Sequence, residues 1–95
     1  MSRRRVVVTG LGCISPVGNN VAQAWRALCA GQSGIGPITQ FDASAFACQI
    51  AGEVKDFDVE SVMPAKEART MDRFIHFGVA AAQQAIEDAA LPHGE

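Results

Sequence analysis

The residues with the greatest potential for chemistry are three cysteines and two histidines, namely Cys13, Cys29, Cys48, His76 and His93. A catalytic thiol requires a base or a positive charge beside it, and a metal site requires several ligands at suitable spacing. There is no CxxC pair, and neither histidine stands near a cysteine in the sequence. Asp72 and His76 are four residues apart, but no third ligand is evident, so we interpret them as a helix-surface pair. We predict no catalytic residue and no metal ligand here, and free thiols in a reducing cytoplasm.

A second candidate is Gly10-Leu11-Gly12, which follows an apolar run and precedes a helix, as does the glycine turn of dinucleotide-binding folds. The match fails in detail, because Ser15 stands at the third glycine position and Pro16 follows it. No acidic residue lies about 20 positions further on, where the ribose contact would be expected. We therefore interpret the glycines as a tight structural turn and predict no cofactor.

Three basic residues, Lys66, Arg69 and Arg73, are separated by three and four positions. On a continuous helix they would form a ridge on one face. Such ridges are usually solvated surface, but on a chain of net charge −2 this one could attract an acidic partner. The arginines at positions 3–5 could form a phosphate-binding arm, although we favour a solvated lead-in to an apolar strand. The net charge favours neither nucleic acid nor an anionic membrane, and no apolar run approaches the about 20 residues of a membrane span.

The elements that must position these groups begin with Val6-Val7-Val8, an unbroken apolar run typical of a strand buried on both faces. A helix follows, for which Asn20 is a suitable N-cap, Gln23 completes an amide capping box and Gly31 suits a left-handed C-cap. Its predicted buried stripe consists of Val21, Ala24, Trp25, Leu28 and Cys29. We expect Trp25 to lie in the core rather than to stack on a ligand.

Further along, residues 32–37 have the composition of a loop, and residues 41–46 are ambiguous, with a short helical turn as one interpretation. Residues 48–54 alternate in polarity and predict an edge or half-exposed strand. Pro64 suits the first turn of a short helix that continues to Arg69.

A long helix is predicted from about Met71 to Ala90, where Pro92 stops it. Its buried stripe is predicted to be Met71, Phe74, Ile75, Gly78, Val79, Ala82, Ala85, Ile86 and Ala89. So many small residues permit close approach of another helix or of a sheet. Strand, glycine turn and helix indicate an α/β protein, but 95 residues supply too few strands to cover the valine run. We therefore expect the front portion of a larger α/β protein.

Six segments carry a family resemblance: Arg4 to Gly12, Ser15 to Asn19, Gly31 to Ile35, Phe41 to Ser44, Ala51 to Phe57 and Met71 to Phe74. Together they resemble the N-terminal quarter of the β-ketoacyl-acyl carrier protein synthases, the condensing enzymes of fatty acid synthesis. They follow the family's order along nearly the whole chain. The Ser15 to Gly18 and Lys55 to Phe57 segments are most similar to the type II (KAS II) branch.

The resemblance implies a thiolase-like layered α-β-α-β-α fold, of which residues 1–95 would be the N-terminal part of one ketosynthase domain with no internal boundary. It implies an acyltransferase that condenses an acyl thioester with malonyl-acyl carrier protein, as a cytoplasmic homodimer. The catalytic cysteine and histidines of the family lie beyond residue 95, so the resemblance assigns no catalytic residue here.

What the resemblance assigns within the chain is a docking patch for acyl- and malonyl-loaded acyl carrier protein at Lys66 and Arg69. Thr70 stands where relatives often have a further basic residue. Two alternatives remain open: a polyketide ketosynthase or its chain-length partner, and a small non-enzymatic binding module that uses the Lys66 to Arg73 ridge.

Overall fold

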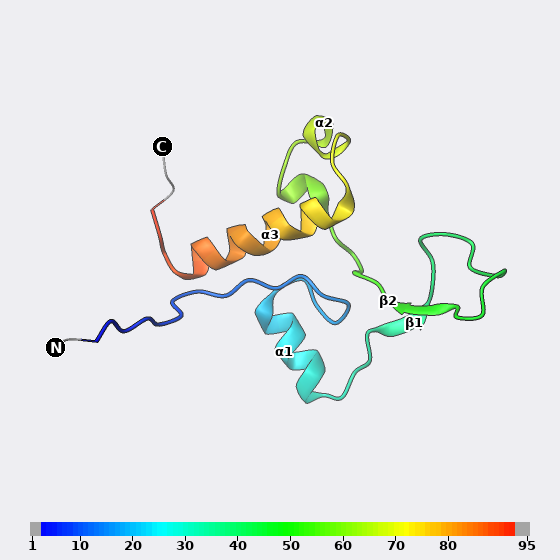
Figure 1. Ribbon diagram of the computed structural model, residues 1–95, viewed down its shortest axis with the longest axis horizontal. Helices are drawn as coiled ribbons and strands as arrows, with labels where there is room; N and C mark the ends of the chain where they lie inside the picture. The colour runs from blue at the N-terminus through cyan, green and yellow to red at the C-terminus, as the bar shows by residue number, and fades with distance from the viewer. Residues whose placement is uncertain (1–2, 93–95) are drawn as a thin grey trace.

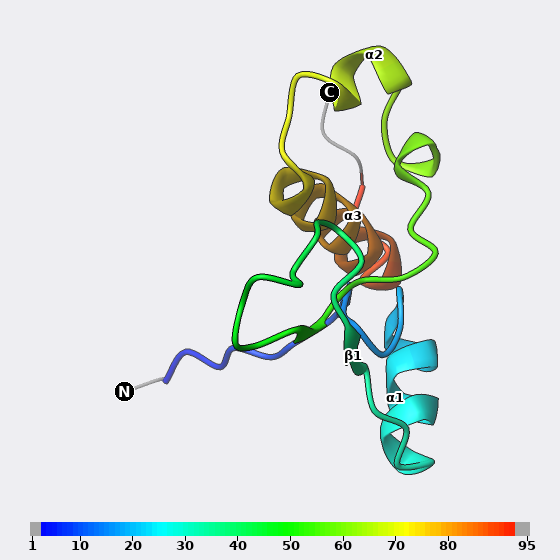
Figure 2. The ribbon, with the colours of Figure 1, turned by 90° about the vertical axis from the view of Figure 1, so that its right-hand side faces the viewer.

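The computed structural model describes residues 3–92, so Met1, Ser2 and the candidate His93 lie outside the described residues. The elements, in order, are helix α1 (Val21–Cys29), strand β1 (Ile35–Pro37), strand β2 (Ile50–Gly52), the 3₁₀ helix η1 (Val59–Ser61), helix α2 (Ala65–Ala68) and helix α3 (Arg73–Asp88). Residues 10–19 run between α1 and α3, and the two strands lie at one end of the molecule (Figure 1). A view from the side shows α2 set apart from α3 and joined to it by a loop (Figure 2).

The molecule is elongated and has little interior. Its extents are 60 × 37 × 25 Å and its radius of gyration is 16.9 Å, whereas a compact domain of this length would have a radius of about 12 Å. The buried apolar residues are Ala24, Ala27, Ala43, Met63, Ala68 and Ala80. Among the described residues no large side chain is fully buried. The packing therefore depends on small residues that let backbone segments approach each other.

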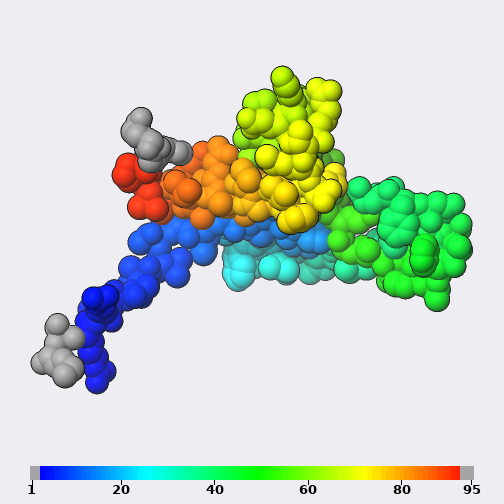
Figure 3. Space-filling model, turned by 45° about the horizontal axis from the view of Figure 1, so that its top comes forward, coloured from blue at the N-terminus to red at the C-terminus, as the bar shows by residue number. Residues whose placement is uncertain are grey.

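The predicted strand at Val6–Val8 is wrong for this structure. These side chains are 94%, 71% and 78% exposed, and the segment is extended without belonging to a strand. The physical reason is the lack of a partner, because among residues 3–92 the only sheet is the pairing of β1 with β2. The segment instead projects from the body of the molecule as a narrow extension (Figure 3).

Helix α1 has the predicted N-cap and C-cap residues, with the reciprocal Gln23 bond of the capping box shifted from Asn20 to Asn19. The Asn20 side chain accepts a hydrogen bond from the Gln23 backbone N–H at 2.8 Å, while the Gln23 side chain accepts one from the Asn19 N–H at 3.0 Å. Gly31 has φ +71°, its N–H donates to Leu28 O, and the next N–H, of Gln32, donates to Ala27 O. This is the Schellman arrangement that a glycine after a helix allows.

The predicted buried face of α1 is only partly correct. Of the predicted residues only Ala24 is buried, together with Ala27, which the predicted stripe did not include. Trp25 is 66% exposed, and Val21, Leu28 and Cys29 are exposed as well, so the expectation that Trp25 lies in the core is wrong. The helix packs through its small residues on the turn at Gly18, where an added Cβ would meet the Ala24 backbone nitrogen at 2.5 Å. The large side chains of α1 therefore face outward.

The two strands form an antiparallel hairpin in the register Ile35↔Gly52, Gly36↔Ala51 and Pro37↔Ile50. The prediction of a loop at residues 32–37 is therefore wrong at its last three positions, because backbone pairing with β2 overrides a composition rich in turn residues. The half-exposed strand predicted at residues 48–54 is confirmed in shortened form. In the connecting loop, the Phe46 N–H donates to Ala43 O, and the rings of Phe41 and Phe46 meet edge to face at 5.9 Å.

Helix α3 covers residues 10–19 through a face of small and polar residues. A Cβ added at Gly10 or Gly12 would overlap the carbonyl oxygens of Ala85 and Ala81, respectively, so glycine is required for this approach. The Leu11 N–H donates to the Asp88 carboxylate and the Cys13 N–H to the Gln84 side chain, each at 3.0 Å. The Gln84 amide in turn donates to Asn19 O at 2.7 Å. The two glycines thus serve close packing against α3.

The predicted buried stripe of α3 is largely wrong in this structure. Phe74 is 71% exposed, Val79 and Ile86 are exposed, and Gly78 faces open space. The face in contact with residues 10–13 includes Ala81, Ala85 and Ala89, and the Gln84 and Asp88 side chains accept hydrogen bonds from backbone N–H groups of that segment. The helix is also shorter than predicted at both ends, and Ala90, at φ +55°, turns the chain before Pro92.

Candidate functional site

The predicted basic residues Lys66 and Arg69 lie on and directly after α2. Both are exposed, and their spacing of three places them on the same face of one helical turn. The Arg69 Nε donates to Ala65 O at 3.4 Å, so the guanidinium folds back along the turn. The structure therefore brings the two predicted docking residues together on one small, solvent-facing element.

Arg73 does not extend this pair as predicted, because α2 and α3 are separate helices. The Thr70 hydroxyl donates to Glu67 O at 2.7 Å, which closes α2, and Asp72 has extended backbone as the N-cap of α3. Arg73 instead lies over the Phe77 ring, 5.0 Å from its centroid, a distance suited to a cation–π contact. The prediction of a continuous three-residue ridge is therefore wrong.

His76 connects the two helices. Its Nε2 lies 2.9 Å from the carbonyl oxygen of Ala68, the last residue of α2, and the ring is half-buried. The same carbonyl accepts the Met71 N–H at 3.2 Å. Asp72 receives the His76 backbone N–H but does not pair with its ring in this arrangement. Sequence analysis missed this role, since nothing in the spacing of residues 68 and 76 indicates that the two helices fold back on each other.

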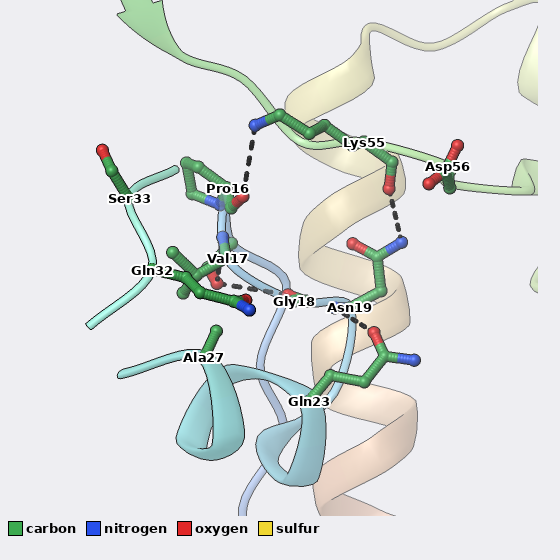
Figure 4. Close-up of a pocket in the computed structure, with 11 residues that line it drawn as sticks. Pro16, Val17, Gly18, Asn19, Gln23, Ala27, Gln32, Ser33, Lys55 and Asp56 are labelled. Atoms are coloured by element: carbon green, nitrogen blue, oxygen red, sulfur yellow. Dashed lines mark hydrogen bonds between the residues drawn. The ribbon is translucent and has the colours of Figure 1, made fainter. Parts of the chain in front are cut away.

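A polar pocket of about 380 Å³ lies where the Ser15 to Gly18 turn meets α1 and the segment after β2 (Figure 4). Lys55 dominates it: its Nζ donates to Pro16 O at 3.3 Å, Gly34 O at 3.1 Å and Glu53 O at 2.9 Å. The Asn19 side chain donates to Lys55 O at 2.8 Å. One ammonium thus joins three separate backbone segments, and its hydrogen-bonding capacity is used within the chain. No pattern in the sequence indicates this role.

Glu53 organises the neighbouring loop. Its carboxylate accepts hydrogen bonds from the Thr39 hydroxyl at 2.8 Å and from the backbone N–H groups of Thr39 and Gln40. These bonds, the Thr39 side chain first, lower the pKa of Glu53 from its ordinary value of 4.5. In the same way, the Ser44 N–H lowers the pKa of Asp42. Both carboxylates therefore stabilise the loop between β1 and β2 by accepting hydrogen bonds from its residues.

The three cysteines form no disulfide bond with one another. All three are free thiols, with Cys13 half-buried beneath α3 and Cys29 and Cys48 exposed. Among residues 3–92, no three or more His, Cys, Asp or Glu side chains gather closely enough to hold a metal ion. None of the described helices combines the length and apolar character needed to traverse a bilayer.

Comparison with known proteins is consistent with this geometry. The profile of the family described as Beta-ketoacyl synthase, N-terminal domain, matches residues 3–95. Two curated relatives named 3-oxoacyl-[acyl-carrier-protein] synthase 2 are similar: one from Synechocystis sp. is 57% identical over 91 residues, 96% of this chain and 22% of the relative. The other, from Vibrio cholerae, is 56% identical over 95 residues, 100% of this chain and 23% of the relative.

Among solved structures, the ishigamide ketosynthase/chain length factor superposes with a TM-score of 0.83 at 41% identity. The match covers 96% of this chain and 23% of that one. The chain belongs to the β-ketoacyl synthase family and has the fold of the N-terminal part of a thiolase-like ketosynthase. It spans 22–23% of the length of the two curated relatives described above.

Proposed function

We propose that the chain is the N-terminal part of a 3-oxoacyl-[acyl carrier protein] synthase of fatty acid synthesis. Such an acyltransferase condenses an acyl thioester with malonyl-acyl carrier protein and loses carbon dioxide. The observation that carries the proposal is the identity of 56–57%, across almost the entire chain, to two proteins named for this activity. Residues 1–95 would form part of a single ketosynthase domain in a cytoplasmic homodimer, and the catalytic cysteine and histidines would come from outside this segment.

We further propose that this segment contributes the docking surface for acyl carrier protein, made by Lys66 and Arg69. Support comes from the exposure of both side chains and from their position on one face of the turn formed by α2 and its C-cap, Arg69. A carrier protein of strongly acidic character would be attracted to such a surface by electrostatic steering. Arg73, held over Phe77, lies outside this docking surface.

The test is charge reversal in the full-length protein. The double variant Lys66→Glu, Arg69→Glu should raise the KM for carrier-bound substrate roughly tenfold, since two attractions become repulsions. Turnover of a small thioester without the carrier should stay within about twofold. The matched control is Arg26→Glu, which reverses an exposed charge in the last turn of α1.

Salt dependence provides a second readout. The KM of the parent enzyme for carrier-bound substrate should rise with ionic strength, while that of the double variant should be nearly flat. An unchanged KM in the double variant at low salt would contradict the docking surface, whatever the identity of the enzyme.

The second candidate function is that of a polyketide ketosynthase or its chain-length partner. The superposition on the ishigamide ketosynthase/chain length factor supports it, although at 41% its sequence identity is lower than that to the synthases. Acylation of the full-length protein by a substrate thioester, followed by mass spectrometry, separates an active ketosynthase of either pathway from a chain-length partner. An active synthase forms a covalent acyl-cysteine, whereas a chain-length partner without the nucleophile does not.

A further inference from the structure

We propose that His76 is a positioning residue for the docking surface formed by Lys66 and Arg69. This inference rests on the proposed function of that surface. It concerns a residue of α3 that would contact neither the carrier protein nor its substrate, and that would act only by holding α2 in place.

The geometry of the contact is specific. The Nε2 of His76 lies 2.9 Å from Ala68 O, across the break between the two helices. Ala68 lies between the two docking residues, directly before Arg69. Because a carbonyl oxygen only accepts, the imidazole must donate from Nε2, in either the neutral Nε2–H tautomer or the imidazolium. The Ala68 carbonyl also accepts the Met71 N–H at 3.2 Å, so the imidazole uses its second acceptor position and is the donor that reaches it from α3.

Helix α2 depends on such an outside contact. It has four residues, a single turn, and its N-cap Pro64 provides no side-chain hydrogen bond. A helix of this length is unstable by itself. Apart from His76, its anchors are the buried Ala68, the buried Met63 in the chain leading into the helix, and packing against η1. Small apolar contacts of this kind restrict position but do not fix the direction in which a single turn points.

Helix α3 is well placed to fix the orientation of α2. It has 16 residues, and Gln84 and Asp88 hydrogen-bond it to the backbone of residues 11–19. His76, in its first turn, is the point where this fixed helix holds the end of α2. Without the ring, the turn that carries Lys66 and Arg69 would sample several orientations. The carrier protein would then bind a smaller fraction of competent molecules, which weakens the apparent affinity.

The experiment compares His76→Leu, which removes the donor, with His76→Gln, whose amide can still donate, in the full-length protein. We expect His76→Leu to raise the KM for carrier-bound substrate about three- to tenfold with kcat within twofold. The KM for a small thioester without carrier should not change. His76→Gln should restore most of the loss. The control is Gln83→Leu, which removes a donor to Glu87 on the same helix, with no bond to α2.

A double-mutant cycle tests whether His76 acts through the surface. In the Lys66→Glu, Arg69→Glu background, His76→Leu should change the KM by less than twofold, because there is no longer an attractive surface to position. If His76→Leu unfolds the protein, His76→Ala, which adds no branched apolar group, takes its place.

The outcomes separate the two proposals. A silent His76→Leu beside an effective double charge reversal overturns the positioning role and leaves the docking surface intact. A silent double charge reversal overturns both, even if His76→Leu has an effect. An equal loss with carrier-bound and carrier-free substrate would show general destabilisation and would also overturn the positioning role.

Discussion

Gly12 lies against Ala81 of α3 so closely that a methyl group on Gly12 would overlap the Ala81 carbonyl oxygen. Gly12→Ala should therefore force apart the segment of residues 10–19 and α3, at a cost of about 1–3 kcal/mol or more in the free energy of unfolding. Urea denaturation of the full-length protein measures this cost. The matched control is Gly36→Ala, where nothing lies within 4 Å of the added methyl. Equal stability of the two variants would contradict the close approach.

Lys55→Met should lower the free energy of unfolding by about 2 kcal/mol, because three backbone carbonyls lose a charged donor while the apolar stem is retained. Thermal unfolding provides the measurement. Lys66→Met, at an exposed lysine of α2, is the control and should be nearly neutral. A Lys55→Met protein as stable as this control would mean that the ammonium does not join the three segments.

The pH dependence of stability should include a contribution from Glu53, whose pKa in the folded protein is lowered from 4.5. Since the unfolded chain then binds the proton more readily, this contribution is complete above pH 4.5 and is lost as the pH falls through the lower folded value. Glu53→Gln should therefore flatten the fall in the urea midpoint between about pH 5 and pH 3. Asp42→Asn should have an effect in the same direction, because hydrogen bonds from Ser44 lower the pKa of Asp42 from 3.8. An unchanged acid profile in Glu53→Gln would contradict the Thr39 contacts.

Val7→Asp should destabilise the proposed full-length protein but not residues 1–95 alone. Val7 is 71% exposed in this structure, so the substitution should leave unfolding of residues 1–95 alone almost unchanged. In the full-length protein, where we expect the valine run to be covered on both faces, a buried carboxylate should cost several kcal/mol. Calorimetry on both proteins makes the comparison. A neutral effect in the full-length protein would contradict the predicted central strand.

Features set by neighbouring residues were predictable from the sequence. The caps of α1 follow from Asn20, Gln23 and Gly31, because hydrogen bonds within a few residues determine them. The half-exposed strand β2 was also recognised from its alternation. The pairing of Lys66 with Arg69 on one face needed only the spacing of three within one turn.

Features that depend on distant partners were not predictable. The valine run and Trp25 carry the pattern of buried residues, yet both are exposed among the residues that this structure describes. The periodicity of apolar residues indicates which face of a helix or strand is apolar, but it does not indicate which other segment packs on that face. The separation of α2 from α3 agrees with the predicted helix ends near Arg69 and Met71, but the His76 contact that joins the two helices links positions without a recognisable spacing.

The hydrogen bonds that join residues 11–19 to α3 also constrain the order of assembly. Leu11 and Asp88 are separated by 77 positions, and Cys13 and Gln84 by 71. During synthesis on a ribosome, residues 11–13 can therefore form these bonds only after α3 has emerged. Until then the backbone N–H groups of Leu11 and Cys13 lack these acceptors, so a segment made well before α3 gains its native contacts only after α3 has followed.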